Sequence, residues 1–357
     1  MPTGPASERP RVEVVVLTHG DYTRRYLPAC YASLRRQTYP PARFGITVVD
    51  NGATDESRKL ISQSAPSASR IENRNNLGWS GGNNRAVRKA LSGPCDHIVL
   101  LNVDTTVDPD WLERLVEAAE TRGDVHILQS TVLLHHNGAL QSAGNRIHYL
   151  GYGYCAGYGR TSEAVIEPAN VDFASGAAML VKRRVFERVG LFREEYFLYY
   201  DDVEFCWRAR LAGFNVGTAP ASVCRHRYDF HDRLRMLFYF QRNRLLTLLT
   251  LQRVRTILVT LPCLLLSELA VGLYFLAQGR GGEVWALLRH FLRRETWTAI
   301  AARRREVAVL RTRKDADIVG RFAGRIVFAE LNGPVMRYLL NPLLAGYWAV
   351  ARRLIVW

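Results

Sequence analysis

Short apolar runs recur along the first third of the chain, separated by longer amphipathic stretches. Runs at residues 12–17, 45–49 and 98–101, with a shorter one around Ile71, are rich in Val, Ile and Leu. Unbroken apolar runs of this length are typical of strands that are buried on both faces of a parallel sheet. The pattern therefore predicts four strands in this part of the chain.

Helical spacing of apolar residues appears between and after these runs. It predicts helices at 26–36, from 54 or 55 to 61, at 85–91, and from Asp108 to about Gly123. Asp followed by Pro is a strong helix start, with Asp as N-cap. Strand and helix alternate four times, which predicts an α/β fold with a mostly parallel, doubly wound sheet flanked by helices.

The alternation loosens beyond residue 125. Residues 127–134 and 177–181 read as strands, and a helix with one apolar stripe begins near Asp202 and ends at Gly213. Residues 216–227 hold one further strand and a loop. We therefore expect one catalytic-size domain over residues 12–228, preceded by a disordered polar leader at residues 1–11.

The composition changes after about residue 229, and we expect a separate, mainly α-helical region from there to residue 357. Residues 256–277 are apolar and long enough for a membrane span, although Glu268 lies within them. Residues 293–313 are rich in arginine, and 338–357 are again apolar. This pattern predicts membrane association by in-plane or re-entrant helices, with a true span and a soluble helical subdomain as alternatives.

The chain carries a formal net charge of +15, which points to an anionic partner such as lipid headgroups or phosphorylated substrates. Six widely spaced cysteines without a C-x-x-C pattern favour buried free thiols in a reducing compartment. The polar N-terminus has no apolar signal segment, which favours the cytosol.

Polar or Gly-rich segments follow each of the first four predicted strands. They are Thr18, Asp50, the Gly/Asn stretch 75–84 and Asp104. The carboxyl ends of parallel strands share one edge of the sheet, where α/β proteins bind ligands. A helix beginning near Arg85 would offer backbone N–H groups to phosphate. Asp104 would offer a hard oxygen ligand to Mg²⁺ or Mn²⁺ bound with nucleotide phosphates.

Two further groups carry candidate chemistry. Asp201 and Asp202 stand at a predicted helix start. Helix capping alone can explain one of the two carboxylates. The functional interpretation is a general base that deprotonates an acceptor hydroxyl. His226 lies in a basic segment, either as a surface histidine or as a metal ligand, since neutral imidazole suits Mn²⁺.

Together these segments resemble the family 2 inverting glycosyltransferases, in the branch of bacterial rhamnosyl- and galactofuranosyl-transferases. The resemblance covers residues 12–228 and rests on the segments VVVLT (14–18), VVDNGATD (48–55), NNLGWSGGNN (75–84), LLNVD (100–104), SGAAML (175–180) and FLYYDDVEFCWR (197–208).

The resemblance implies a GT-A fold and a UDP-, dTDP- or GDP-sugar donor. Thr18 and Asp50 would contact the donor, Asp50 at its base or ribose, and Asn75 and Gly78 would lie on the nucleotide side. Asp104 would bind both donor and metal.

On the other side of the predicted site, the resemblance makes Asp202 the catalytic base. It places Ser175, Gly176 and Asp201 on the acceptor side, and it makes His226 a second ligand of the Mg²⁺ or Mn²⁺ ion.

The chain departs from the family pattern at two positions. Asn102 stands where many members have Asp, so metal binding would rest on Asp104 and His226. Gly20 replaces a frequent Asn after the first strand, which weakens that expected donor contact.

We therefore expect a metal-dependent enzyme at the cytoplasmic face of the cell membrane. It would transfer a rhamnose-like or other hexose to a glycan or polyprenyl-diphosphate-linked acceptor in envelope polysaccharide synthesis.

A processive membrane synthase is the nearest alternative, although its Gln-x-x-Arg-Trp signature is missing. A dinucleotide-dependent oxidoreductase is the alternative from another class, with a misspaced Gly-rich segment at 151–157. A nucleic-acid partner is not expected, because it would leave the acidic strand ends without a role. The oligomeric state stays open.

Overall fold

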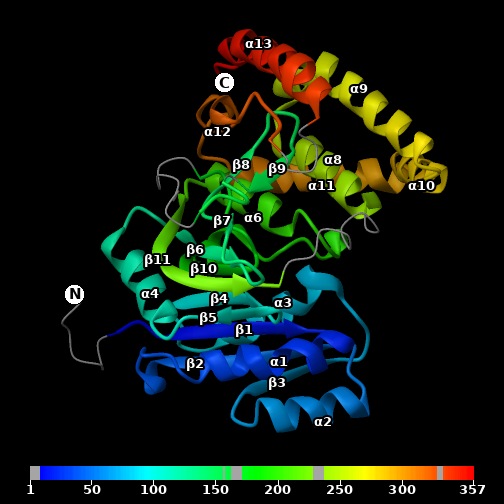
Figure 1. The fold of residues 1–357 in the computed structure, drawn as a ribbon. Helices are drawn as coiled ribbons and strands as arrows, with labels where there is room; N and C mark the ends of the chain where they lie inside the picture. Colours follow the sequence, from blue (N-terminus) through cyan, green and yellow to red (C-terminus); the bar gives the residue numbers. More distant parts are fainter. Residues whose placement is uncertain (1–8, 156, 162–170, 228–236, 328–332) are drawn as a thin grey trace. The chain divides into compact units, whose positions relative to one another are not determined.

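A computed structural model describes residues 9–155, 157–161, 171–227, 237–327 and 333–357 (Figure 1). Within these residues, nine strands form one sheet in the order β3-β2-β1-β4-β10-β6-β11-β5, with β7 paired to β6. Their bounds are β1 Val12–Thr18, β2 Phe44–Asn51, β3 Ser69–Asn73, β4 His97–Asn102, β5 Thr105–Val107, β6 Ile127–Leu134, β7 Leu140–Ser142, β10 Ala178–Lys182 and β11 Val216–His226. A second sheet pairs β8 (Asn145–Ile147) with β9 (Gly153–Cys155).

The four strands predicted at the start of the chain are present and mutually parallel, in the order β3-β2-β1-β4. Strand β10 then runs antiparallel to both β4 and β6, while β6 and β11 are parallel and β5 is antiparallel to β11. The sheet is therefore mixed, and the reversal at β10 places a new chain segment directly beside β4.

Among the described residues up to 227, six α-helices are present. Their bounds are α1 Asp21–Leu34, α2 Asp55–Ser64, α3 Gly78–Ser92, α4 Trp111–Thr121, α5 Arg183–Val189 and α6 Asp201–Leu211, with 3-10 turns at Pro41–Arg43 and Glu194–Tyr196.

Alternation along β1 distributes these helices over the two faces of the sheet. Val14 and Val16 belong to a buried core that they share with side chains of α1, α2 and α4. Leu17 points the other way, and its side chain closely approaches Gly82 in α3. Helix α3 therefore covers the face opposite α1.

Two predicted helix starts are wrong. Helix α1 begins at Asp21, directly after Gly20 at φ 53°, rather than at Tyr26. Helix α3 begins at Gly78 rather than near Arg85, so most of the Gly/Asn stretch is helical and not a loop. The glycines of α3 serve packing, because an added Cβ at Gly82 would lie 2.4 Å from Leu17.

The segment after β4 also differs from the prediction. The short strand β5 comes first, and α4 begins at Trp111 with Asp110 as its N-cap residue. Asp108 is not the cap, because its carboxylate pairs with Arg225 of β11. Pairing with β11 extends this segment before the helix can begin.

The last residues of the predicted disordered leader, 9–11, form contacts with the sheet unit. Residues 1–8 lie outside the described part of the chain. The Arg9 guanidinium forms an ion pair with Glu113 at 2.9 Å, and the backbone N–H of Arg11 donates to Asp96 at 2.7 Å. The ordered chain therefore begins at least three residues before Val12.

The chain forms two compact units. The sheet unit comprises the described residues of 1–145, 155–206 and 214–228, and the helical unit those of 146–154, 207–213 and 229–357. Helices of the latter are α8 Leu237–Leu251, α9 Val254–Ala277, α10 Gly281–Leu292, α11 Arg294–Leu310, α12 Asp315–Ile318 and α13 Asn341–Ala351, with short turns at Val319–Arg321, Met336–Leu340 and Arg352–Leu354.

Trp111 anchors α4 on the sheet and supplies a test of this core. Its side chain is fully buried, and its indole N–H donates to Ser130 at 2.8 Å. Trp111→Ala leaves a large cavity and removes one of the hydrogen-bond partners of Ser130, so we expect a loss of about 3–5 kcal/mol in the free energy of unfolding, measured by urea titration. Tyr22→Ala, at a residue 41% exposed, is the control and should cost less than about 1 kcal/mol. Equal losses in the two variants would contradict the assigned core.

Candidate active site

Asp104 and His226 are brought together by strand pairing. Asp104 lies in the turn between β4 and β5, and His226 is paired in register with Thr105 on β5. The His226 Nε2 and Asp104 Oδ1 atoms are 3.1 Å apart, and both side chains are largely buried. A backbone bond from Arg227 N–H to the Asp104 carbonyl, 2.9 Å long, closes the turn. Residues 122 positions apart thus share one corner of the sheet.

Gln141 on β7 holds the other ring nitrogen of this histidine. Its Oε1 atom lies 2.9 Å from His226 Nδ1. If Nδ1–H donates to Gln141, the Nε2 lone pair of a neutral ring faces the Asp104 carboxylate. Two lone pairs that face each other need a cation between them or a proton on the ring. A histidine oriented through its second nitrogen is the usual arrangement for a metal ligand.

The residues present therefore fit a divalent cation. Within the described residues no group of three or more His, Cys, Asp or Glu side chains is arranged to hold a metal. The protein would supply one carboxylate and one imidazole, and water and phosphate oxygens would complete the coordination, as is common for Mg²⁺. Asn102 is engaged elsewhere, since its Oδ1 atom accepts the indole N–H of Trp79 at 3.1 Å.

Asp202 stands in the first turn of α6, where the helix dipole favours negative charge. One carboxylate oxygen accepts the backbone N–H of Gly176 at 3.1 Å, and the other accepts that of Val203 at 2.8 Å. These two bonds orient the carboxylate. Asp201 is buried and accepts a hydrogen bond from Ser80 of α3, so it links the starts of two helices, and its place on the acceptor side stays a prediction.

Trp79, at the start of α3, connects these groups. Its backbone N–H donates to the carbonyl of Phe197 at 2.6 Å, and its indole N–H binds Asn102. Its ring lies so close to Gly176 that an added Cβ there would be 2.6 Å away. Trp79 thus contacts the segment before α6 through its backbone, and the loop that binds Asp202 and the end of β4 through its side chain.

The segment before α6 is strained. Phe197, Tyr199 and Tyr200 have backbone φ values of 64–67°, which residues other than glycine rarely adopt. Such conformations cost about 1–3 kcal/mol each and persist where the surroundings impose them. Gly78 provides part of that constraint, because an added Cβ would lie 2.1 Å from the Phe197 carbonyl oxygen.

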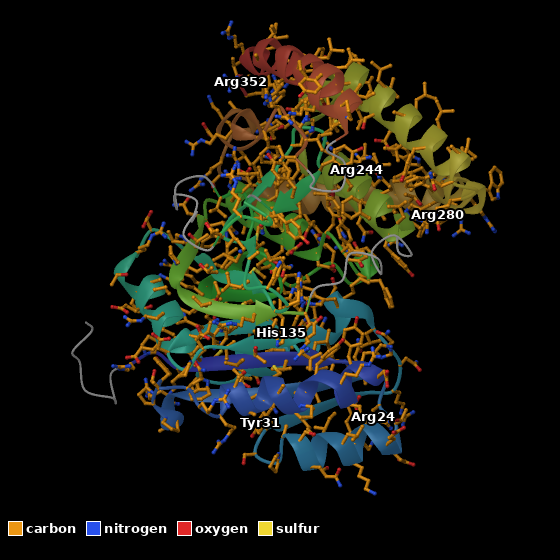
Figure 2. The ribbon with its side chains drawn as sticks, viewed as in Figure 1. Arg24, Tyr31, His135, Arg244, Arg280 and Arg352 are labelled. Carbon is orange, nitrogen blue, oxygen red and sulfur yellow. The ribbon has the colours of Figure 1, made fainter. Side chains whose placement is uncertain are left out.

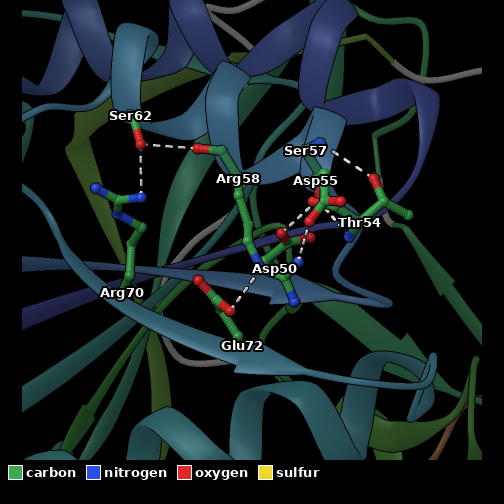
Figure 3. Close-up of polar contacts among 8 residues, drawn as sticks. All are labelled: Asp50, Thr54, Asp55, Ser57, Arg58, Ser62, Arg70 and Glu72. Carbon is green, nitrogen blue, oxygen red and sulfur yellow. Dashed lines mark hydrogen bonds and ion pairs between the residues drawn. The ribbon is translucent and has the colours of Figure 1, made fainter.

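Asp50 and Thr18 end adjacent strands and are paired in register. Asp50 is 1% exposed and accepts a 2.5 Å hydrogen bond from Ser57 at the start of α2, while its Oδ1 atom has no partner in the described residues. Burial raises the pKa of the Asp50 carboxyl, and the Ser57 hydrogen bond opposes that rise. Figure 3 shows Arg58 directed to Asp55 and Glu72. An unpaired buried acceptor at a strand end fits a ligand hydroxyl or N–H.

The remaining predicted donor and acceptor residues lie in different settings. Asn75 is exposed, whereas Gly78 is buried against Phe197. The backbone N–H of Ser175 donates to Gln129 at 2.8 Å, and Gln129 is itself fully buried. Thr18 is buried, and its hydroxyl pairs with that of Thr23 at 2.8 Å.

Three positioning residues were missed from sequence. Trp79 lies inside the Gly/Asn stretch and could have been noted as its one aromatic residue. Gln141 and Gln129 had no signal, because an isolated glutamine on a strand is ordinarily a surface residue. Only the pairing of β7 with β6 and of β6 with β11 places them at the site.

A central sheet with acidic strand ends, a histidine returning beside one of them and a carboxylate at a helix start is the arrangement of a GT-A glycosyltransferase. GalNAc-T7, crystallised with UDP, GalNAc and Mn²⁺, has the same fold, with a TM-score of 0.53 at 13% identity over 68% of this chain and 48% of that one. The model of glycosyl transferase family 2 matches residues 13–190, and the chain belongs to that family.

Two relatives with assigned activities are similar to this chain in sequence. The low-salt glycan biosynthesis hexosyltransferase Agl10 of Haloferax volcanii is 29% identical over 48% of this chain and 54% of its own length. The N-acetylglucosaminyl-diphospho-decaprenol L-rhamnosyltransferase of Mycobacterium tuberculosis is 26% identical over 60% of this chain and 75% of its own. The chain thus spans about half the length of the first of these relatives.

The contact between Gly78 and Phe197 can be tested with a closely matched pair of glycines. Gly78 and Gly138 have φ values of 71° and 70°, but a Cβ at Gly138 meets nothing within 4 Å. Gly138→Ala should cost only backbone strain, about 1–2 kcal/mol. Gly78→Ala should cost about 1–3 kcal/mol more in urea titrations and should also lower transfer activity, because the strained segment must move. Similar behaviour of the two variants would show that the close approach does not matter.

Proposed function

We propose that this chain is an inverting glycosyltransferase. It moves a rhamnose-like or other hexose from a nucleotide sugar to a hydroxyl of a glycan or polyprenyl-diphosphate-linked acceptor. The observation that carries the proposal is a pair of groups linked through Trp79, whose ring lies against Gly176 and whose indole N–H binds Asn102, two residues before Asp104. Asp202 is oriented at a helix start on one side, and Asp104 lies beside His226 on the other.

The donor would lie along the carboxyl ends of β1, β2 and β4. Asp50 offers a buried, unpaired carboxylate oxygen to the base or ribose. Asp104 lies two residues beyond the end of β4, which is the strand next to β1. We also assign Asn75 and Thr18 to the donor side in this proposal. Gly78 contributes by allowing α3 to begin against Phe197.

Transfer is a single displacement at the anomeric carbon. The acceptor oxygen attacks from the face opposite the nucleotide, its proton passes to Asp202, and the bond from the anomeric carbon to the diphosphate oxygen breaks. The configuration therefore inverts. Hydrogen bonds from Gly176 and Val203 hold the Asp202 carboxylate in one orientation, which reduces the cost of positioning the base.

Asp104 and His226 are the residues that would hold Mg²⁺ or Mn²⁺. A divalent cation bound there would supply charge stabilisation for the departing diphosphate. Gln141 would keep the imidazole in the tautomer whose Nε2 carries the lone pair that coordinates a cation. The Mn²⁺ in the GalNAc-T7 crystal structure supports the same metal class.

The acceptor is proposed from the relatives. One is named for transfer to a diphospho-decaprenol-linked sugar, which is a lipid-anchored acceptor. An enzyme acting on such an acceptor works at a membrane surface, here at its cytoplasmic face. The basic, apolar C-terminal region fits that location.

The alternative functions have less support. The described residues of the Gly-rich segment at 151–157, which could have held a dinucleotide, form strand β9 and turns rather than the strand-to-helix turn of that motif. A processive synthase would be expected to have several membrane spans. Among the described residues, α9 is the one helix long and apolar enough to cross a membrane.

Removal of the proposed base gives the most direct test of the reaction. Asp202→Asn keeps the size of the side chain but cannot take the proton, and its single acceptor oxygen can keep only one of the two backbone hydrogen bonds. We expect transfer, followed by mass detection of the glycosylated acceptor, to fall by about 10²–10⁴-fold. Binding of UDP or dTDP by calorimetry should be unchanged. Asp110→Asn, at a residue that pairs with Arg114, is the control and should retain transfer. Full turnover by Asp202→Asn would exclude this residue as the base.

The metal proposal can be tested through binding alone. Gln141→Ala removes the partner of His226 Nδ1, so the Mn²⁺ dissociation constant, measured by electron paramagnetic resonance with UDP or dTDP present, should rise by about 10–100-fold. Asp104→Asn should have a larger effect. Asp108→Asn provides the matched control, because this nearby carboxylate pairs with Arg225 instead of His226. Unchanged Mn²⁺ binding in Asp104→Asn would contradict the site.

A further inference from the structure

Helix α9 has its apolar face exposed. Between residues 258 and 277 every exposed position of this helix carries an apolar or aromatic side chain. Six leucines are more than half exposed: Leu258, Leu265, Leu266, Leu269, Leu273 and Leu276. Their spacing follows the helical period, so they form one continuous stripe.

The opposite face of α9 carries the polar residues and is held by the helical unit. Thr256 is buried and donates to Asp315 at 2.6 Å. Further along, Ser267 shares a 2.8 Å hydrogen bond with Tyr152. A helix on the surface of a soluble protein has the reverse arrangement, with polar residues facing water.

Glu268 is the residue that argued against a membrane helix in the sequence. In the structure its carboxylate pairs with Arg244, whose side chain is 0% exposed. Arg244 also donates to the Leu150 carbonyl at 2.7 Å and lies over the Tyr152 ring at 4.3 Å. The charge on Glu268 is therefore satisfied inside the unit and does not disturb the leucine stripe.

Exposed apolar side chains are concentrated in this unit. Among the described residues, Tyr22 is the single large hydrophobic residue of the sheet unit that is exposed, and the others lie between Val254 and Val356. On α10, Trp285, Leu288 and Leu292 are 53–77% exposed. Patches of this kind mark membrane or protein contacts.

Charge separates these two possibilities. Residues 229–357 contain 21 Arg and Lys against 9 Asp and Glu, a net charge of +12 out of +15 for the whole chain. Figure 2 shows Arg280 at the turn between α9 and α10 and Arg352 beyond α13. Arg289, Arg293 and Arg294 are exposed on and after α10. Arginines beside exposed leucine and tryptophan match an anionic lipid surface.

We propose that the leucine stripe of α9, with the exposed face of α10, docks in the plane of an anionic bilayer and does not cross it. A crossing helix would be surrounded by lipid, whereas α9 is attached to the unit along its polar face. Crossing would break the Glu268–Arg244 pair or carry it into the hydrocarbon. This docking goes beyond the transfer reaction, since it requires neither donor nor acceptor.

Flotation of the full chain with vesicles tests the surface. We expect binding to phosphatidylcholine vesicles that contain phosphatidylglycerol, and weaker binding without the anionic lipid. The triple variant Leu265→Gln, Leu269→Gln, Leu273→Gln changes residues that are 57–60% exposed, so folding should be retained. Its partition coefficient should fall at least about tenfold. Tyr22→Gln, at the exposed aromatic residue of the sheet unit, is the control and should bind as the parent does.

The orientation of α9 needs a second measurement. Single cysteines at Arg255→Cys and Gln278→Cys report on the two ends of the helix, both exposed. In sealed vesicles an in-plane helix lets an impermeant maleimide label both ends from the same side, above the background of the parent chain. If one end were labelled only from outside the vesicles and the other end only from inside, α9 would span the bilayer, and the proposal would be overturned.

Two further outcomes would also overturn it. Absence of vesicle binding by the folded parent chain would remove the lipid partner. Conversion of a dimer to a monomer by the triple variant, without a change in flotation, would assign the stripe to a second copy of the chain. Neither result bears on transfer to a soluble acceptor, so failure here is separate from failure of the glycosyltransferase assignment.

Discussion

The organisation of the site depends on the close approach of two backbone segments. The start of α3 touches the carbonyl of Phe197, and only a residue without Cβ fits at Gly78. The hydrogen bond from Trp79 N–H to that carbonyl, 2.6 Å long, keeps the segments together. The contact imposes left-handed backbone on the residues before α6 and so determines where α6 begins. The carboxylate of Asp202 takes its position from that start.

Three polar groups of the candidate site are held by the amide side chains of Asn102, Gln141 and Gln129. Asn102 binds Trp79, Gln141 binds His226 and Gln129 binds the loop at Ser175. All three are amides, which accept or donate without carrying charge. A site built this way keeps its charged residues few and oriented. In the proposed reaction, the carboxylates of Asp104 and Asp202 are the ones assigned to the donor and acceptor sides.

The two units follow opposite rules of burial. In the sheet unit, apolar residues of the strands and of α1, α2 and α4 form a closed core. In the helical unit, α9 turns its polar residues inward and its leucines outward. The same hydrophobic effect explains both patterns if the first unit is surrounded by water and the second faces lipid. A lipid-linked acceptor would bring both requirements into one enzyme.

The sequence by itself determined the four parallel strands, the acidic strand ends and the family resemblance, because apolar runs and turn residues are local signals. It did not reveal that the Gly/Asn stretch is helical. Gly82 is needed there because helix α3 packs closely against Leu17 of β1, and that contact is not visible in the local sequence. The pairing of Asp104 with His226, 122 residues apart, was decided by the antiparallel β5 and β11. Likewise, Glu268 counted against a membrane helix until the fold supplied Arg244 as its partner. Contacts between distant segments are made only in the tertiary structure, because a residue's own neighbours in the chain do not specify which strand or helix it will face.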